Sequence, residues 1–226
     1  MMFSKSFMYV VFLFIIILFS NINFAQESSN ILATQIQLTK IEGESISAIL
    51  AKIALTYNIP ISFQSRLNYE SRRYAKKKIK IPRKDSLRQI LNELVKTDPD
   101  YTWEESNGII RFFPKFKEDL IISELLETSI KKIVLDENPS KMYIGDLIFK
   151  TPEIKNKLLS NGITKIQFYY ATELFNESLW LKKTAYQFEN TKVIEILNRI
   201  IKESSKKFWI ISRWGAHNEF ITLIVK

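Results

Sequence analysis

The chain reads Ile90-Leu91-Asn92-Glu93-Leu94-Val95-Lys96 and repeats this phrase 106 residues later as Ile196-Leu197-Asn198-Arg199-Ile200-Ile201-Lys202. Trp103 returns at the same offset as Trp209, and each tryptophan opens a stretch rich in strand-forming residues. The apolar residues of both phrases recur at the spacing of one helix face. The pattern indicates a duplicated helix and strand, and it predicts two small tandem units rather than one catalytic fold.

The first unit begins with residues 35–41, where polar and apolar side chains alternate as in a half-buried strand. Ser45 is the expected N-cap of an amphipathic helix, and residues 59–63 follow as a second strand. Further on, the pattern predicts a short strand over 78–82, the repeated helix after Asp85 or Ser86, and a hairpin around Asn107-Gly108. The order is β-α-β followed by β-α-β-β.

The second unit is a stretched copy of the first. We expect a strand over 128–135 and helical structure to about residue 159, interrupted at Thr151-Pro152. Strands over 163–170 and 179–188, the repeated helix and a hairpin around Gly215 complete it. The predicted fold class is therefore α+β, with two small modules at residues 34–117 and 118–226.

Residues 36–113 resemble the short N-terminal domain of secretins and TonB-dependent receptors. The resemblance rests on four phrases of the first unit, which are Ser47-Ala48-Ile49-Leu50-Ala51-Lys52-Ile53-Ala54, Ile59-Pro60-Ile61-Ser62-Phe63, Leu87-Arg88-Gln89-Ile90-Leu91 and Tyr101-Thr102-Trp103 with Asn107-Gly108-Ile109-Ile110. Residues 180–226 resemble only the second half of that domain. The resemblance implies a Gram-negative source and an adaptor that makes protein–protein contacts in the periplasm, although neither a barrel nor a secretin core follows.

The first 25 residues have the pattern of a secretory signal peptide. Lys5 precedes an unbroken apolar run of 13 residues, Phe7 to Phe19, and Ala25 supplies the small residue before a cleavage site. The run is short for a spanning helix, which needs about 20 residues. We therefore expect export to the periplasm with cleavage after Ala25, and an uncleaved inner-membrane anchor is the alternative.

The composition gives little support to catalysis. The chain has no cysteine and one histidine, His217, so thiolate chemistry is excluded and nothing marks a positioned histidine. We expect no metal and no cofactor, because only scattered carboxylates remain as ligands. Glu104 and Glu105 are interpreted as a strand edge. The chain is predicted not to be an enzyme, with an envelope hydrolase that uses carboxylate catalysis as the alternative from another class.

The strongest electrostatic feature is a basic segment in a chain whose formal net charge is +9. It contains eight cations and no acid, and these are the candidate contacts for an anion or a partner: Arg72, Arg73, Lys76, Lys77, Lys78, Lys80, Arg83 and Lys84. A solvated loop that leads into a protected edge strand is the plainer interpretation. Trp180 and Trp214 are candidate exposed aromatic contacts, whereas Trp103 and Trp209 are expected in the cores.

These features together predict an exported periplasmic interaction module that docks on an envelope complex of the secretin or TonB-dependent receptor type. The expected partner is a protein of the cell envelope. An anion-binding protein is a further alternative, for which peripheral contact with anionic lipid is the stronger version and nucleic acid the weaker.

The signal-peptide prediction has a direct test. The mature protein isolated from its own cells is expected to begin at Gln26, because Ala25 is the small residue at the end of the polar stretch after the apolar run. Intact-mass measurement and N-terminal sequencing check this expectation. A mass that retains residues 1–25 would identify the uncleaved anchor instead.

Overall fold

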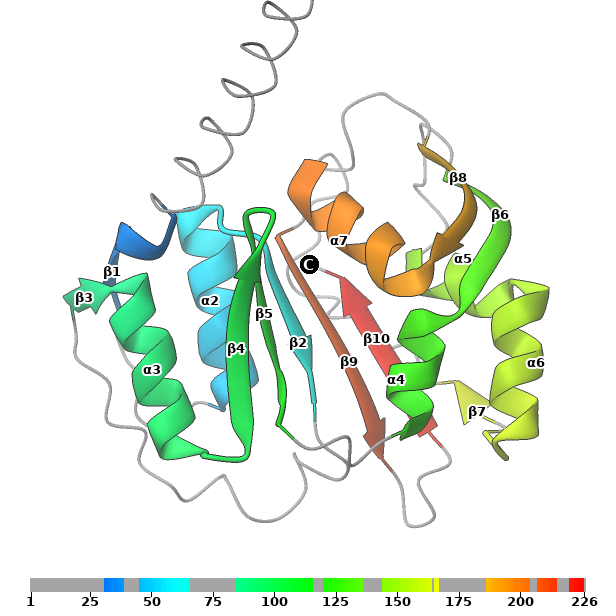
Figure 1. The fold of residues 1–226 in the computed structure, drawn as a ribbon, viewed down its shortest axis with the longest axis horizontal. Coiled ribbons are helices and arrows are strands. Elements are labelled where there is room, and N and C mark those ends of the chain that lie inside the picture. The colour runs from blue at the N-terminus through cyan, green and yellow to red at the C-terminus, as the bar shows by residue number, and fades with distance from the viewer. Residues whose placement is uncertain are drawn as a thin grey trace, which may run out of the picture.

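The structure, a computed structural model, describes residues 31–38, 45–65, 84–115, 120–135, 144–163, 165–166, 186–203, 207–214 and 220–225. Residues 1–25, the expected signal peptide, lie outside the described residues. Helices and strands alternate along the described chain, which confirms the predicted α+β class (Figure 1). None of the helices in this part of the chain has the length and apolar character that crossing a bilayer requires.

The first half has the predicted element order. Its elements are β1 (Gln35–Gln37), α2 (Ile46–Tyr57), β2 (Ile61–Gln64), β3 (Lys84–Ser86), α3 (Leu87–Thr97), β4 (Tyr101–Ser106) and β5 (Ile109–Pro114). The strand predicted over 78–82 lies outside the described residues, and β3 follows it in the chain.

The second half repeats this order with two additional helices, one at its start and one before its second strand. Its elements are α4 (Leu120–Glu127), β6 (Ser129–Leu135), α5 (Ile144–Lys150), α6 (Pro152–Ser160), β7 (Lys165–Ile166), β8 (Tyr186–Lys192), α7 (Val193–Glu203), β9 (Phe208–Trp214) and β10 (Phe220–Val225). The predicted helix break at Thr151-Pro152 is confirmed. β8 continues to Lys192, beyond the predicted end at residue 188. The proposed module boundary between 117 and 118 lies outside the described residues and stays a prediction.

Local sequence explains where the repeated elements begin and turn. The Ser45 hydroxyl accepts a hydrogen bond from the Ala48 N–H at 3.2 Å, and the Ser86 hydroxyl accepts one from Gln89 at 3.3 Å, so serine caps both helices of the first half. Asn107 and Gly108 have φ values of 54° and 76°, which are the left-handed values that a two-residue hairpin of the primed type requires.

The two halves share one six-stranded sheet with the order β4-β5-β2-β9-β10-β7 (Figure 1). Each half contributes three strands in corresponding order: β4-β5-β2 from the first and β9-β10-β7 from the second. The halves meet where β2 pairs with β9 in parallel, with Ile61 opposite Phe208 and Phe63 opposite Ile210. The pairs β1-β3 and β6-β8 form separate two-stranded sheets.

The shared sheet separates two apolar cores, and β9 contributes to both. Phe208 and Ile210 belong to the N-terminal core, which contains the buried faces of α2 and α3. Trp209 and Ile211 belong to the C-terminal core, which contains α4, α5, α6 and α7. Because successive side chains of a strand point to opposite faces, the helices of the two halves cover opposite faces of the sheet.

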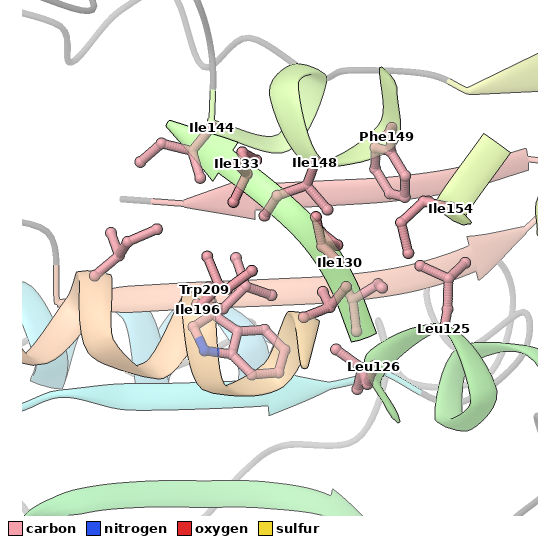
Figure 2. Close-up of a cluster of buried hydrophobic side chains, with 14 of the residues drawn as sticks. Leu125, Leu126, Ile130, Ile133, Ile144, Ile148, Phe149, Ile154, Ile196 and Trp209 are labelled. Carbon is pink, nitrogen blue, oxygen red and sulfur yellow. The ribbon is translucent and has the colours of Figure 1, made fainter. Parts of the chain in front are cut away.

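The C-terminal core includes the repeated tryptophan. In Figure 2, Trp209 lies beside Ile196 of α7, with Leu126 of α4 and Ile130 of β6 in the same cluster. Trp209 is only 2% exposed and is among the largest fully buried side chains of the described residues. The prediction that Trp209 fills a core is confirmed. Trp103 packs against the N-terminal core but is half-buried.

Trp209→Ala is expected to destabilise the protein by about 3–5 kcal/mol, because it removes a buried aromatic side chain and leaves a cavity. The matched control is Leu159→Ala on α6, where the leucine is 57% exposed, and its effect should stay within about 0.5 kcal/mol. Urea unfolding monitored by circular dichroism measures both changes. Similar losses in the two variants would contradict the contribution of buried Trp209 to the core.

Candidate functional site

The described residues do not unite the contacts predicted from sequence. Trp180 lies outside the described residues. So do seven of the eight cations of the basic segment, which are Arg72, Arg73, Lys76, Lys77, Lys78, Lys80 and Arg83. Lys84 begins β3, where it is exposed and pairs opposite Gln37. Trp214 ends β9 in a different sheet, with its backbone opposite Phe220. A basic anion or partner site therefore stays a prediction.

Each half contains the same side-chain contact, a hydrogen bond between a tryptophan and an asparagine. The Trp103 Nε1–H donates to Oδ1 of Asn92 at 3.1 Å, and the Trp209 Nε1–H donates to Oδ1 of Asn198 at 3.0 Å. Each asparagine lies on the repeated helix, 11 residues before its tryptophan. A tryptophan in a core needs an acceptor for its indole N–H, and each half supplies it from the same position. The duplication thus includes polar chemistry as well as apolar spacing.

The equivalent tryptophans differ in their surroundings. Trp209 lies on an interior strand, because β9 has β2 on one side and β10 on the other. Ser62 of β2 is directly opposite Trp209 and is itself buried. Trp103 lies on β4, which among the described strands pairs only with β5. The half-buried state of Trp103 is therefore that of an edge residue.

Backbone hydrogen bonds define how β9 receives β2. The Ile61 N–H donates to the carbonyl of Lys207 at 2.8 Å, and the Ser65 N–H donates to the carbonyl of Ile211 at 2.9 Å. Backbone groups alternate in direction along a strand. The N–H and C=O groups of residues 207, 209 and 211 therefore point toward β2.

The residues of β4 that point their backbone groups away from β5 are the repeat equivalents of the β9 residues that face β2. The Lys115 N–H donates to the carbonyl of Asp100 at 2.7 Å, which makes 100 and 115 a hydrogen-bonded pair next to β4 and β5. By alternation, the N–H and C=O groups of Trp103 and Glu105 point away from β5. At the repeat offset of 106, these residues correspond to Trp209 and Ile211, whose backbone side faces β2. We call the segment of residues 103–105, with the backbone groups of Trp103 and Glu105 on its outer side, the β4 edge.

The β4 edge carries two acidic side chains, Glu104 on the face away from α3 and Glu105 on the same face as Trp103. Glu104 forms an ion pair with Arg111 of β5 and retains 45% side-chain exposure. The Arg111 guanidinium lies 5.5 Å from the centre of the Phe113 ring, a cation–π distance. The Glu105 carboxylate accepts the Gly108 N–H at 2.8 Å and stabilises the hairpin turn. Two carboxylates thus mark an edge in a chain that is basic as a whole.

A buried lysine lies at the joint between the halves. Lys207 is 9% exposed, its carbonyl accepts the bond from Ile61, and its ammonium group donates to the carbonyl of Lys202 at 3.3 Å near the end of α7. Burial lowers the pKa of Lys207 below the usual 10.5, because a desolvated ammonium group loses hydration. The carbonyls at a helix C-terminus favour a cation at this place and partly offset that loss.

The described residues offer no sign of metal chemistry. Within these ranges no group of three or more His, Cys, Asp or Glu side chains is placed to hold a metal ion. The candidate site is the β4 edge, which is built from backbone groups and a few side chains.

Sequence analysis identified Glu104 and Glu105 as a strand edge but did not recognise the β4 edge as a site. The available signal was the repeat itself, because it makes Trp103 equivalent to Trp209. What the sequence did not show was that β9 is paired on both sides.

Comparison of the chain with protein-family models, curated proteins and solved structures finds no match.

The buried lysine predicts a defined pH dependence. In the folded state the pKa of Lys207 is lowered, so the unfolded chain binds more protons between that lowered pKa and 10.5. The contribution of Lys207 to the free energy of unfolding should therefore rise as the pH rises through that window. Lys207→Met should abolish this rise, so the stability of the wild type relative to the variant increases toward alkaline pH.

Urea unfolding of the two proteins at a series of pH values measures this difference. Lys84→Met is the matched control, because Lys84 is exposed, and it should leave the pH dependence of the wild type unchanged. A stability difference between wild type and Lys207→Met that does not vary with pH would contradict the prediction.

Proposed function

We propose that the protein is an exported, non-enzymatic interaction module that docks on a protein complex of the cell envelope, of the secretin or TonB-dependent receptor type. Two features support the proposal. The first half has the residue pattern of the short N-terminal domain of those proteins, and its hairpin ends in an edge strand that can pair with another chain. Export to the periplasm after cleavage at Ala25 is part of the same proposal.

The β4 edge is the observation that carries the proposal. Exposed strand edges are usually protected, because unpaired backbone groups attract other strands. Within this chain the equivalent edge, on β9, is already paired with β2. Strand addition at an exposed edge is a common way for small domains to bind a segment of another protein. The geometry that joins the two halves therefore supports a docking role.

The test is cross-linked co-purification from the native cell envelope. The chain carries an affinity tag after Lys226, and cells are treated with a membrane-permeable cross-linker before solubilisation. A tag exported behind the same first 25 residues is the matched control. The expected result is recovery of one envelope component in nearly equal amount with the tagged chain and absent from the control.

Recovery of the tagged chain alone, from cells in which it is abundant, would contradict the docking function. A component recovered equally with the control tag would contradict it as well, because the exported tag lacks both modules.

A further inference from the structure

We infer that the β4 edge accepts an extended segment of the envelope partner as an additional parallel strand, with a small residue opposite Trp103 and a cationic residue opposite Glu104. This inference depends on the proposed docking function and deepens it. It names the edge, the strand direction, the register and the side chains that the partner must supply.

Direction and register follow from the joint within the chain. β2 runs parallel to β9 and places Ser62 opposite Trp209 and Phe63 opposite Ile210. Because β4 is the repeat equivalent of β9 and exposes its backbone groups in the same phase, a strand added there in the same way is parallel to β4. Its successive residues lie opposite Thr102, Trp103, Glu104 and Glu105.

Packing restricts the partner residue opposite Trp103. Ser62, the residue at this place in the internal joint, is buried beside Trp209 and directs its hydroxyl toward the carbonyl of Ile110, 3.5 Å away. Trp103 is held from the side of α3 by its bond to Asn92, as Trp209 is held by Asn198. A bulky residue opposite Trp103 would compete with the helix for the same volume, so a small residue is required.

Charge restricts the partner residue opposite Glu104. The internal joint has an apolar pair at this place, Phe63 and Ile210, and both are in the N-terminal core. The β4 edge has a half-exposed carboxylate there, flanked by Arg111 on its inner side. Opposite charges on directly neighbouring strand positions are favourable, whereas an apolar or acidic residue next to Glu104 is not. The added strand therefore carries lysine or arginine at this position.

The absence of cysteine allows the contact to be mapped with single reactive positions. Thr102→Cys and Ser106→Cys, each labelled with a benzophenone maleimide, place a photo-cross-linker at the β4 edge. Leu159→Cys on α6, 57% exposed, is the control position. The expected result is that the component recovered with the tagged wild-type chain is cross-linked from 102 and 106 and not from 159. The cross-linked segment should carry the small and cationic residues in adjacent positions.

Charge reversal tests the role of Glu104. Glu104→Lys should reduce recovery of the component by about tenfold, because it places like charges side by side. Glu127→Lys is matched to it, since Glu127 also loses one exposed ion pair, with Lys192, away from the β4 edge. Recovery with Glu127→Lys should equal that of the wild type.

Hydrogen exchange on the purified complex tests the backbone register. The amide protons of Trp103 and Glu105 should gain protection on binding, whereas those of Thr102 and Glu104, which face β5, should change little. Folding of every variant is checked by circular dichroism.

The outcomes separate this inference from the proposed function. If the wild-type chain recovers no envelope component, the docking function fails. If a component is recovered but is cross-linked from 159 rather than from 102 and 106, is unaffected by Glu104→Lys, or leaves Trp103 and Glu105 unprotected, docking stands and strand addition at β4 is overturned. Cross-links from the β4 edge to a second copy of the chain would also overturn it.

Discussion

The parallel pairing of β2 with β9 is the contact on which the arrangement of the molecule depends. It joins two three-stranded halves into one sheet and connects residues far apart in sequence, with Phe63 opposite Ile210. It also requires β9 to be apolar on both faces, since Phe208 belongs to one core and Trp209 to the other. A strand buried on both faces is typical of the interior of a sheet and does not tolerate polar substitution on either side.

The pairing of β2 with β9 also gives the two equivalent strands of the repeat, β4 and β9, different surroundings. Trp103 and Trp209 bond to asparagines at the same position of the repeated helix, so each half uses the same internal construction. The strand that carries Trp209 is fully paired within the chain, whereas β4, among the described strands, has β5 alone as its neighbour. A duplicated module joined in this head-to-tail manner uses one copy of its edge internally and leaves the other at the end of the sheet. We propose that this remaining copy is used for the partner.

The electrostatics of the two edges differ in a way that suits these separate uses. The internal joint is apolar at Phe63 and Ile210, and the buried cation Lys207 lies near the carbonyls that end α7. An apolar joint favours permanent association, because separation would expose both side chains to water. At β4 the corresponding position is Glu104, half-exposed and paired with Arg111. A charged edge remains compatible with water when it is unpaired and discriminates among strands by their charge.

Much of the local structure was predictable from the sequence. Apolar spacing predicted the repeated helices, Ser45 predicted where the first helix begins, and Asn107-Gly108 predicted a hairpin, because these signals act between residues close together in the chain. For the second helix the sequence offered Asp85 or Ser86, and the structure has Ser86 as the cap. That the halves share a sheet and cover its opposite faces could not be predicted, because the pairing of Ile61 with Phe208 leaves no trace in local periodicity. The candidate site could be recognised only from this shared sheet. Glu104 and Glu105 are visible in the sequence as a strand edge, but the edge became informative only when its equivalent in β9 proved to be occupied.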